Sequence, residues 1–351
     1  MGTPRFRPFA SVVLSRVVLS LVVLSRVVLS RVVLSLVVLA LVAAPAAAQS
    51  DYPRRPITLI VPFAAGGPTD TISRIVGEHM SRTLGQPIVF ENSVGAPGLT
   101  ASTRAMRANP DGYLILMGHM GTHATAVSLV RNLAYDPVND FSPIGLVAAT
   151  AVLIVARKDF PPIDLAEFLR YVKINASSLK TAHAGVGSVS FTSALLLNYL
   201  IQAKPSALPY AGTGPAMTAL ARGQVDFMCD QIVNVVPRLQ GGAIKAYAVG
   251  TRERNPVLPS VPTAGEAGLP EFDVSAWNAL FAPKGAPQPV LDRLTDALDR
   301  ALDDDTVRGR LLALGAGVPT KERRGQQALA ALVKSEIARW SQIIKAAGPL
   351  N

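Results

Sequence analysis

The sequence has little cysteine and few aromatic residues. Cys229 is the single cysteine among 351 residues, so the chain cannot form an intramolecular disulfide or a CxxC-type zinc site. Aromatic residues make up 6% of the chain, and after residue 50 they are not interleaved with runs of basic residues. This pattern argues against nucleic-acid binding.

Acidic residues are absent from the first 50 positions, and arginine supplies every charge there. Residues 12–41 repeat a pentad, VVLSR or VVLSL, and the apolar run ends in small residues at Ala46, Ala47 and Ala48. A basic start, an apolar stretch and an A-x-A site together predict a secretory signal peptide over residues 1–48, removed after Ala48. A retained signal anchor is the alternative interpretation.

Beyond Ala48 no apolar stretch approaches about 20 residues, so the exported chain is not expected to span a membrane. Removing the leader leaves 303 residues and lowers the formal net charge from +10 to +5. The arginines lost with the leader are Arg5, Arg7, Arg16, Arg26 and Arg31. The modest positive charge that remains would suit a small anionic ligand.

Short apolar runs alternate with helical patterns along the rest of the chain, which predicts an α/β fold with largely parallel sheets. The run at 57–62 reads as a buried strand, and helical spacing begins at Pro68. Long apolar runs at 146–156 and 272–282 predict strands that cross between two lobes. Residues 50–150 and 273–351 would form lobe 1, residues 151–272 would form lobe 2, and a ligand cleft would lie between them.

The loop FAAGGPTD, residues 63–70, follows a predicted strand and opens a predicted helix. Its glycines allow backbone N–H groups to face a cavity, and a helix N-terminus favours an anion. The loop lacks the GKS/T of a Walker motif and the GxGxxG of a dinucleotide site. Asp70 either caps the helix or accepts a hydrogen bond from a ligand.

The loop at 118–124 contains His119 and His123, a spacing that could bind zinc on a helix. Gly121 interrupts that spacing and the HExxH glutamate is missing, so no metal site is expected. Thr122 and His123 are expected to offer donors to an anion, whereas His119 is expected to be packed or solvent-facing. In lobe 2, the G-x-S-x-G of a serine hydrolase is also missing. The candidate binding residues of this lobe are Ser188, Ser190, Tyr210 and Asp230.

Long segments of the chain resemble the Bug-type receptors of tripartite tricarboxylate transporters. Among them are YPRRPITLIVPFAAGGPTDTISR, PDGYLILMG, PYAGTGPAMTALARGQVDFMCDQ and WNALFAPKGAPQPVLDRL, and the resemblance covers residues 51–348. It implies a type II periplasmic-binding-protein fold, two lobes closing on a small carboxylate, and delivery of that ligand to membrane permease subunits. It also implies a protein that is not an enzyme and uses no cofactor. We expect the protein to be a monomer.

The resemblance implies that main-chain amides of the first-lobe loops hold the carboxylate and that second-lobe residues close over it. The positions that match these loops are Phe63, Ala65, Gly66, Gly67, Pro68, Thr69, Asp70, Thr122, His123, Ser188, Ser190, Tyr210 and Asp230. One departure is Pro97, which stands where the family often has glycine; proline fixes φ and removes an N–H donor.

Two other functions remain open. An enzyme on the same bilobal fold would pair His123 with Asp70 or Asp230 as base and acid. A ligand sensor would present the closed receptor to a kinase ectodomain. The ligand itself also stays open among dicarboxylates, citrate, acidic amino acids and aromatic acids.

Overall fold

The computed structural model describes residues 52–95 and 98–347, together with residues 26, 30 and 31 of the leader. The predicted signal peptide with its cleavage site at Ala48, and Pro97, lie outside the residues described. The chain divides into residues 1–52 and residues 53–351, and the second unit carries the fold. In the part that is described, none of the helices has the length and apolar character needed to cross a bilayer.

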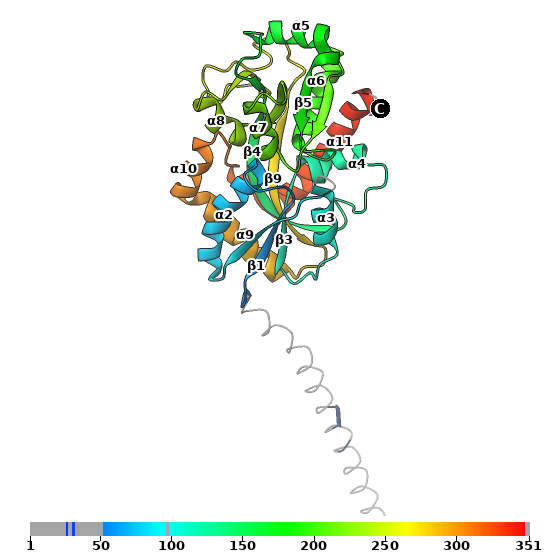
Figure 1. Cartoon of the computed structure of the whole chain (residues 1–351). Coiled ribbons are helices and arrows are strands. Elements are labelled where there is room, and N and C mark those ends of the chain that lie inside the picture. The colour runs from blue at the N-terminus through cyan, green and yellow to red at the C-terminus, as the bar shows by residue number, and fades with distance from the viewer. Residues whose placement is uncertain (1–25, 27–29, 32–51, 96–97, 348–351) are drawn as a thin grey trace, which may run out of the picture. The chain divides into compact units, whose positions relative to one another are not determined.

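A nine-stranded mixed sheet runs through the second unit (Figure 1). Its strands follow one another in space in the order β2 (Ile88–Asn92), β1 (Ile57–Val61), β3 (Leu114–His119), β9 (Ser275–Pro283), β4 (Phe141–Arg157), β7 (Phe227–Gln231), β5 (Lys180–His183) and β6 (Ser206–Pro209), while β8 (Ile244–Val249) pairs with β4. Strands β1, β2 and β3 are parallel, as are β5, β6 and β7. The α/β class predicted from the sequence is therefore observed.

The 17-residue strand β4 connects the two lobes. From Phe141 to Ala151 it pairs with β9, and from Val152 onward it pairs with β7 and β8. Strand β9 is the return crossing, and it pairs with β3 on its other side. The structure thus has a crossing strand at each of the two apolar runs, although β4 begins five residues before the run recognised in the sequence.

Helices cover both halves of the sheet (Figure 1). Those of the β1–β3 half are α2 (Pro68–Leu84), α3 (Leu99–Met106), α4 (Ala126–Leu129), α9 (Gln288–Asp303), α10 (Asp305–Ala313) and α11 (Gly325–Ala347). Those of the β5–β7 half are α5 (Leu165–Asn175), α6 (Val189–Ile201), α7 (Thr213–Ala221) and α8 (Ile232–Gln240). Short helical turns lie at Gly121–Thr125, Ala176–Ser178 and Lys321–Arg323.

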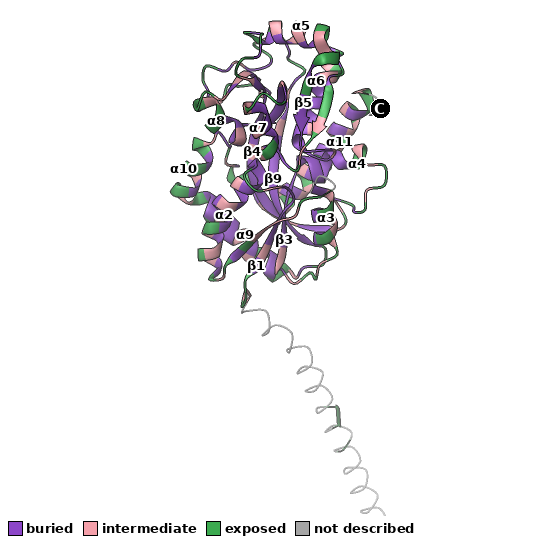
Figure 2. Ribbon diagram, viewed as in Figure 1, coloured by how far each residue is buried: buried purple, intermediate pink, exposed green. Residues whose placement is uncertain are grey.

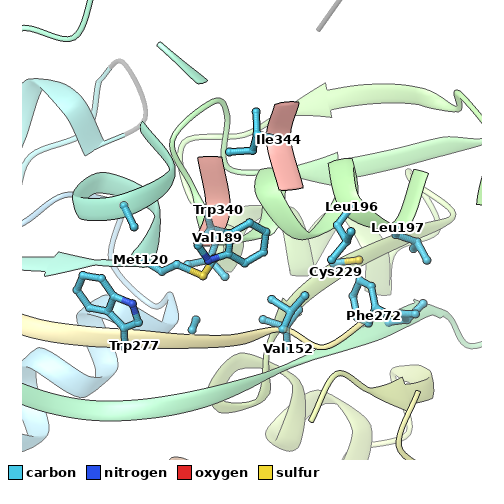
Figure 3. Packing of buried hydrophobic residues seen from close by; sticks show 14 of the residues in the cluster. Met120, Val152, Val189, Leu196, Leu197, Cys229, Phe272, Trp277, Trp340 and Ile344 are labelled. Atoms are coloured by element: carbon cyan, nitrogen blue, oxygen red, sulfur yellow. The ribbon is translucent and has the colours of Figure 1, made fainter. Parts of the chain in front are cut away.

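The central strands and the inner faces of the helices are buried, as the purple ribbon of Figure 2 shows, whereas the edge strand β6 is largely exposed. One apolar cluster extends from the first half of the sheet to the second (Figure 3). In it Trp340 of α11 is fully buried, and Glu336 accepts hydrogen bonds from the indole N–H of both Trp277 (3.3 Å) and Trp340 (3.2 Å). Helix α11 contacts β4 and α6, so the C-terminal helix packs against elements of both lobes.

Candidate functional site

A pocket of about 320 Å³, its open mouth included, lies where the lobes meet. The lining residues are Phe63, Gly67, Pro68, Thr69 and His119 from the first lobe and Ala184, Ser188, Val189, Ser190, Thr213 and Gln231 from the second. None of these residues carries a formal positive charge, so an anion here would be held by neutral donors.

Helix α2 begins at the pocket. Gly67 is its N-cap and Pro68 is at the first helical position, where the missing N–H costs nothing. Gly66 has φ of 82°, a left-handed conformation that glycine adopts without strain. The first turn of a helix leaves backbone N–H groups without intrahelical partners and carries partial positive charge, so this end of α2 favours an anion.

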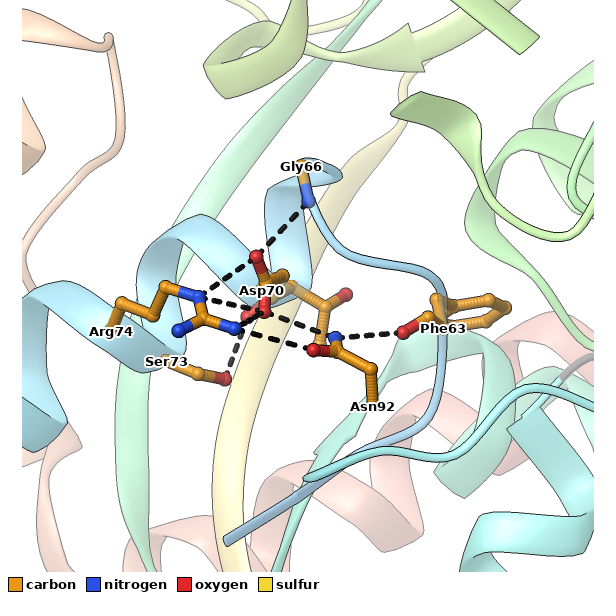
Figure 4. A network of polar contacts seen from close by, with 7 residues as sticks. Phe63, Gly66, Asp70, Ser73, Arg74 and Asn92 are labelled. Atoms are coloured by element: carbon orange, nitrogen blue, oxygen red, sulfur yellow. Dashed lines mark hydrogen bonds and ion pairs between the residues drawn. The ribbon is translucent and has the colours of Figure 1, made fainter. Parts of the chain in front are cut away.

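Asp70 holds the loop before α2 in place (Figure 4). Its carboxylate accepts hydrogen bonds from the Gly66 N–H (3.0 Å), from Asn92 Nδ2 (3.0 Å) and from Arg74 Nε (3.0 Å). Asn92 Nδ2 also donates to the Phe63 carbonyl at 2.9 Å. Asp70 is buried and is not among the lining residues, so its contacts position the loop rather than reach into the pocket.

The charge of Asp70 is stabilised by the same contacts. Burial alone would raise the pKa of this carboxyl, but the Arg74 guanidinium, the Gly66 N–H and the Asn92 amide together hold the pKa below its usual value. The carboxylate therefore stays ionised and keeps the loop ordered at neutral pH.

His119 closes β3 and faces the pocket, which the sequence reasoning did not anticipate. Its Nδ1 accepts a hydrogen bond from the Gly121 N–H at 2.8 Å, so Nε2 carries the proton of the neutral ring. Burial lowers the pKa of His119 to about 3, so the ring is uncharged at neutral pH. The ring stacks on Phe63 with centroids 5.1 Å apart, and Nε2 is buried without a hydrogen-bond partner.

Thr122 and His123 lie behind His119 in the π-helical turn Gly121–Thr125. The ring of His123 stacks on Phe281 with centroids 4.0 Å apart, and the Thr122 carbonyl accepts from the Tyr135 hydroxyl at 2.7 Å. Neither Thr122 nor His123 is among the lining residues. Their assignment to ligand binding stays a prediction.

Two helices of the second lobe also begin at the pocket. Ser188 is the N-cap of α6 and accepts from the Phe191 N–H at 3.1 Å, while Ser190 Oγ accepts from the Ala184 N–H at 3.0 Å. Helix α7 begins at Thr213. Three helix N-termini, from α2, α6 and α7, thus meet around one small space.

The remaining second-lobe candidates lie outside the lining set. Tyr210 is half-buried, and its N–H donates to the His183 carbonyl at 2.8 Å. Asp230 is buried, accepts from the Gln231 N–H at 2.8 Å and from Asn234 Nδ2, and has its pKa raised to about 7 by burial. Ala65, Gly66 and Asp70 of the first lobe are likewise adjacent to lining residues without being among them.

The lobes touch on either side of the pocket. The Ala64 N–H donates to the Ala211 carbonyl at 3.3 Å, and a Cβ placed on Gly214 would lie 3.1 Å from the backbone of Gly66. On the other side, a Cβ on Gly121 would lie 2.2 Å from the Gly187 carbonyl oxygen. The structure is therefore a closed arrangement, in which glycine allows backbones of opposite lobes to approach.

The residues described include one cysteine, a possible nucleophile, and several side chains of the types that bind metal ions. Cys229 is buried, and burial raises the pKa of its thiol, which suppresses the reactive thiolate. In the described part of the chain, no group of three or more His, Cys, Asp or Glu side chains is arranged to hold a metal ion.

Comparison with known proteins decides the family. Residues 72–349 match the family model described as tripartite tricarboxylate transporter family receptor. The chain belongs to this family. A UPF0065 protein from the TAR-I ttuE–ttuC′ intergenic region of Agrobacterium vitis is 42% identical over 303 residues, covering 86% of this chain and 87% of that protein. BugT of Bordetella pertussis is 30% identical over 315 residues, covering 87% and 93%.

Solved structures of family members share the fold. MatC from Rhodopseudomonas palustris with bound malate is 53% identical, with a TM-score of 0.82 over 84% of this chain and all of that one. The periplasmic binding protein BugD is 44% identical, with a TM-score of 0.82 over 85% and 99%. R. palustris Rpa4515 with adipate is 31% identical, with a TM-score of 0.81 over 85% and 98%. The predicted Bug-type resemblance and the bilobal periplasmic-binding-protein fold are thus confirmed, and the chain is a solute-binding receptor by family.

Proposed function

We propose that this receptor captures a small carboxylate between its lobes in the periplasm and delivers it to the permease subunits of a tripartite tricarboxylate transporter. The observation that carries the proposal is the pocket at which the helices α2, α6 and α7 begin, because their N-terminal N–H groups can hold a carboxylate. The family members MatC and Rpa4515 have malate and adipate bound, which supports a carboxylate as the ligand.

Neutral donors are sufficient for this task. Backbone N–H groups at helix N-termini and hydroxyl groups make charge-assisted hydrogen bonds to a carboxylate, and these bonds strengthen when closure excludes water. A receptor must also release its ligand, and a pocket without a formal cation avoids one dominant ion pair. Hinge closure about the crossing strands would allow the permease to recognise the loaded state.

Export would remove residues 1–48, with cleavage after Ala48, and leave a monomeric receptor. We assign residues 50–150 and 273–351 to lobe 1 and residues 151–272 to lobe 2, with the change of β4 partners at Val152 as the supporting observation.

We also propose that the receptor is not an enzyme. His123 packs among aromatic rings, Asp70 is engaged by Gly66, Asn92 and Arg74, and Asp230 is engaged by Gln231 and Asn234. The acid–base pairs that an enzyme would need are therefore committed to packing and to positioning loops. Presentation to a kinase ectodomain is a separate use of the same closed form and would be tested by pull-down with and without ligand.

A thermal-shift screen of residues 49–351 tests the proposal. The panel contains malate, succinate, adipate, citrate, aspartate and benzoate, with the corresponding neutral amides as controls. A ligand that binds only the folded state raises the melting temperature. At 100 times its Kd, such a ligand increases the free energy of unfolding by about 2.7 kcal/mol. We expect a shift with one or a few carboxylates, which NMR recovers unchanged. Shifts confined to the neutral compounds, or none at all, would reject the carboxylate assignment, and turnover of a bound acid would favour the enzyme.

A further inference from the structure

Two buried polar side chains that face each other across neighbouring strands each keep one atom without a partner. His119 of β3 pairs with Asn278 of β9 in the antiparallel register, so their side chains are on the same face of the sheet, with Cβ atoms about 4.5–5.5 Å apart. His119 is 1% exposed and Asn278 is 0% exposed. His119 Nε2 and Asn278 Oδ1 are buried without a hydrogen-bond partner.

The hydrogen-bonding role of each unpartnered atom is set by what the rest of the side chain does. Because the Gly121 N–H donates to His119 Nδ1, Nε2–H is a donor. Because Asn278 Nδ2 donates to Gln231 Oε1 at 3.3 Å, Asn278 Oδ1 is an acceptor. An unpaired buried donor or acceptor is costly, so a neighbouring pair of them calls for a group that satisfies both.

The pair is adjacent to the pocket. His119 and Gln231 both line it, and Asn278 lies between them, paired in register with the first and hydrogen-bonded to the second. Gln231 Oε1 also accepts from the Thr150 hydroxyl at 2.7 Å. With its carbonyl oxygen engaged twice, Gln231 offers the NH₂ end of its amide to a ligand.

A hydroxyl group accepts and donates at one oxygen atom, so it matches a donor placed next to an acceptor. A carboxylate oxygen can only accept, and it would be repelled by Asn278 Oδ1. We propose that His119 and Asn278, with Gln231 beside them, form a subsite for a ligand hydroxyl, so that the receptor selects hydroxycarboxylates over unsubstituted carboxylates. This inference rests on the proposed function, because the carboxylate must first be held at the helix N-termini.

Malate and succinate test the subsite, because these four-carbon dicarboxylates differ by one hydroxyl. Titration calorimetry on residues 49–351 is expected to give a Kd for the better malate enantiomer at least about tenfold below that for succinate, since succinate leaves both atoms unpaired. In His119→Phe, which keeps a ring against Phe63, and in Asn278→Leu, we expect the ratio to fall to within about threefold of one. Succinate binding then reports that each variant is folded.

His183→Phe is the matched control. His183 Nδ1 accepts from the Gly185 N–H at 2.8 Å, the same local bond that Gly121 makes to His119, but His183 is not among the lining residues. This variant loses the equivalent structural bond and is expected to keep the malate preference.

Three results would overturn the hydroxyl subsite while leaving a carboxylate receptor in place. One is equal affinity of the unmodified protein for malate and succinate, as a bound water between His119 and Asn278 would produce. Another is a preference that neither variant reduces. The third is binding of unsubstituted dicarboxylates alone. A protein that binds no carboxylate in the panel fails the proposed function itself, and the subsite with it.

Discussion

His123 is a fully buried, uncharged histidine among aromatic rings. Besides Phe281, its ring lies 4.9 Å from that of Phe141 and 6.2 Å from that of Tyr135, centroid to centroid. Burial, with a smaller contribution from His119, lowers the pKa of His123 to about 3. Since the folded protein holds this ring neutral at pH values where the unfolded chain protonates it, His123 links stability to pH.

Replacing His123 by phenylalanine tests that link. The folded pKa is below the unfolded value of about 6.5, so the contribution of His123 to stability is complete above pH 6.5 and is lost as pH falls towards 3. In that window, one buried neutral histidine changes the free energy of unfolding by up to about 1.4 kcal/mol per pH unit. Urea unfolding at pH 7, 6, 5 and 4.5 measures the free energy of unfolding of both proteins. Below pH 6, the value for His123→Phe should rise relative to that of the unmodified protein by about 1.4 kcal/mol per pH unit. Other titrating groups are common to both proteins, so parallel curves would contradict a neutral His123.

For single residues, the sequence predicts which side chains and loops can offer hydrogen-bond donors more readily than it predicts which of them line the pocket. The sequence identified donors in the loops at 63–70 and 185–191, and Phe63, Gly67, Pro68, Thr69, Ser188 and Ser190 do line the pocket. It favoured His123 over His119, and the structure puts His119 at the pocket. Nothing local distinguishes the two histidines, because the difference arises from the pairing of β3 with β9.

Helix α6 combines a structural cap with a ligand-facing end. Ser188 Oγ accepts from the Phe191 N–H and donates to the Gly185 carbonyl at 2.7 Å, and the same residue lines the pocket. Helix α10 has an equivalent cap at Asp304, whose side chain accepts from the Val307 N–H at 2.9 Å, and Asp304 is not a lining residue. Substituting each cap in turn therefore distinguishes an effect on helix stability from an effect on ligand binding.

Ser188→Ala and Asp304→Ala should each lower the free energy of unfolding by about 1 kcal/mol, the usual cost of losing an N-cap. Only Ser188→Ala is expected to weaken carboxylate binding, by about fivefold or about 1 kcal/mol, because loss of this cap loosens the N-terminus of α6 that lines the pocket. Urea unfolding and calorimetry with the best ligand of the thermal-shift panel measure both quantities. Equal effects of the two substitutions on affinity would show that α6 contributes through stability alone.

Elements bounded by proline, glycine or serine were predictable from the sequence. The predicted strand at 57–62 is β1, the helix expected from Pro68 is α2, and the helix at 189–201 is α6 with the same bounds. The start of β4 was missed because Pro143 and Gly145 disfavour a regular strand, and the register of β4 against β9 shifts between these two residues. A bulge there accommodates both residues, but only the partner strand reveals it.

Glycines at the contact between the lobes allow the two backbones to approach each other closely. Gly214, near the start of α7, contacts the first lobe: its hypothetical Cβ would lie 3.1 Å from the carbonyl carbon and oxygen of Gly66 and 3.3 Å from the Gly67 nitrogen. Its φ is not positive, so a side chain would not strain the helix. An added side chain should therefore disfavour the closed state while leaving the open state intact.

A graded series at Gly214 tests whether closure is needed for binding. Gly214→Ala should weaken carboxylate binding several-fold, and Gly214→Leu should reduce it by at least about a hundredfold, because the larger side chain cannot fit against the Gly66 backbone and the ligand would keep only its first-lobe contacts. Melting temperatures without ligand should stay within a few degrees of the unmodified protein, since opening relieves the clash. Small-angle scattering should show ligand-induced compaction in the unmodified protein and none in Gly214→Leu.

Gly309 of α10 provides the matched control, since a Cβ placed there meets nothing within 4 Å. Gly309→Ala and Gly309→Leu place the same side chains in a helix away from the cleft, and they should bind ligand as the unmodified protein does and compact equally. If Gly214→Leu bound carboxylate as tightly as Gly309→Leu, the contact between Gly214 and Gly66 would have no part in capture. The ligand would then have to be held by one lobe, and the pocket lining contributed by Ser188, Thr213 and Gln231 would be dispensable. If Gly214→Leu instead loses affinity while its melting temperature stays unchanged, ligand binding requires contacts from both lobes in the closed state.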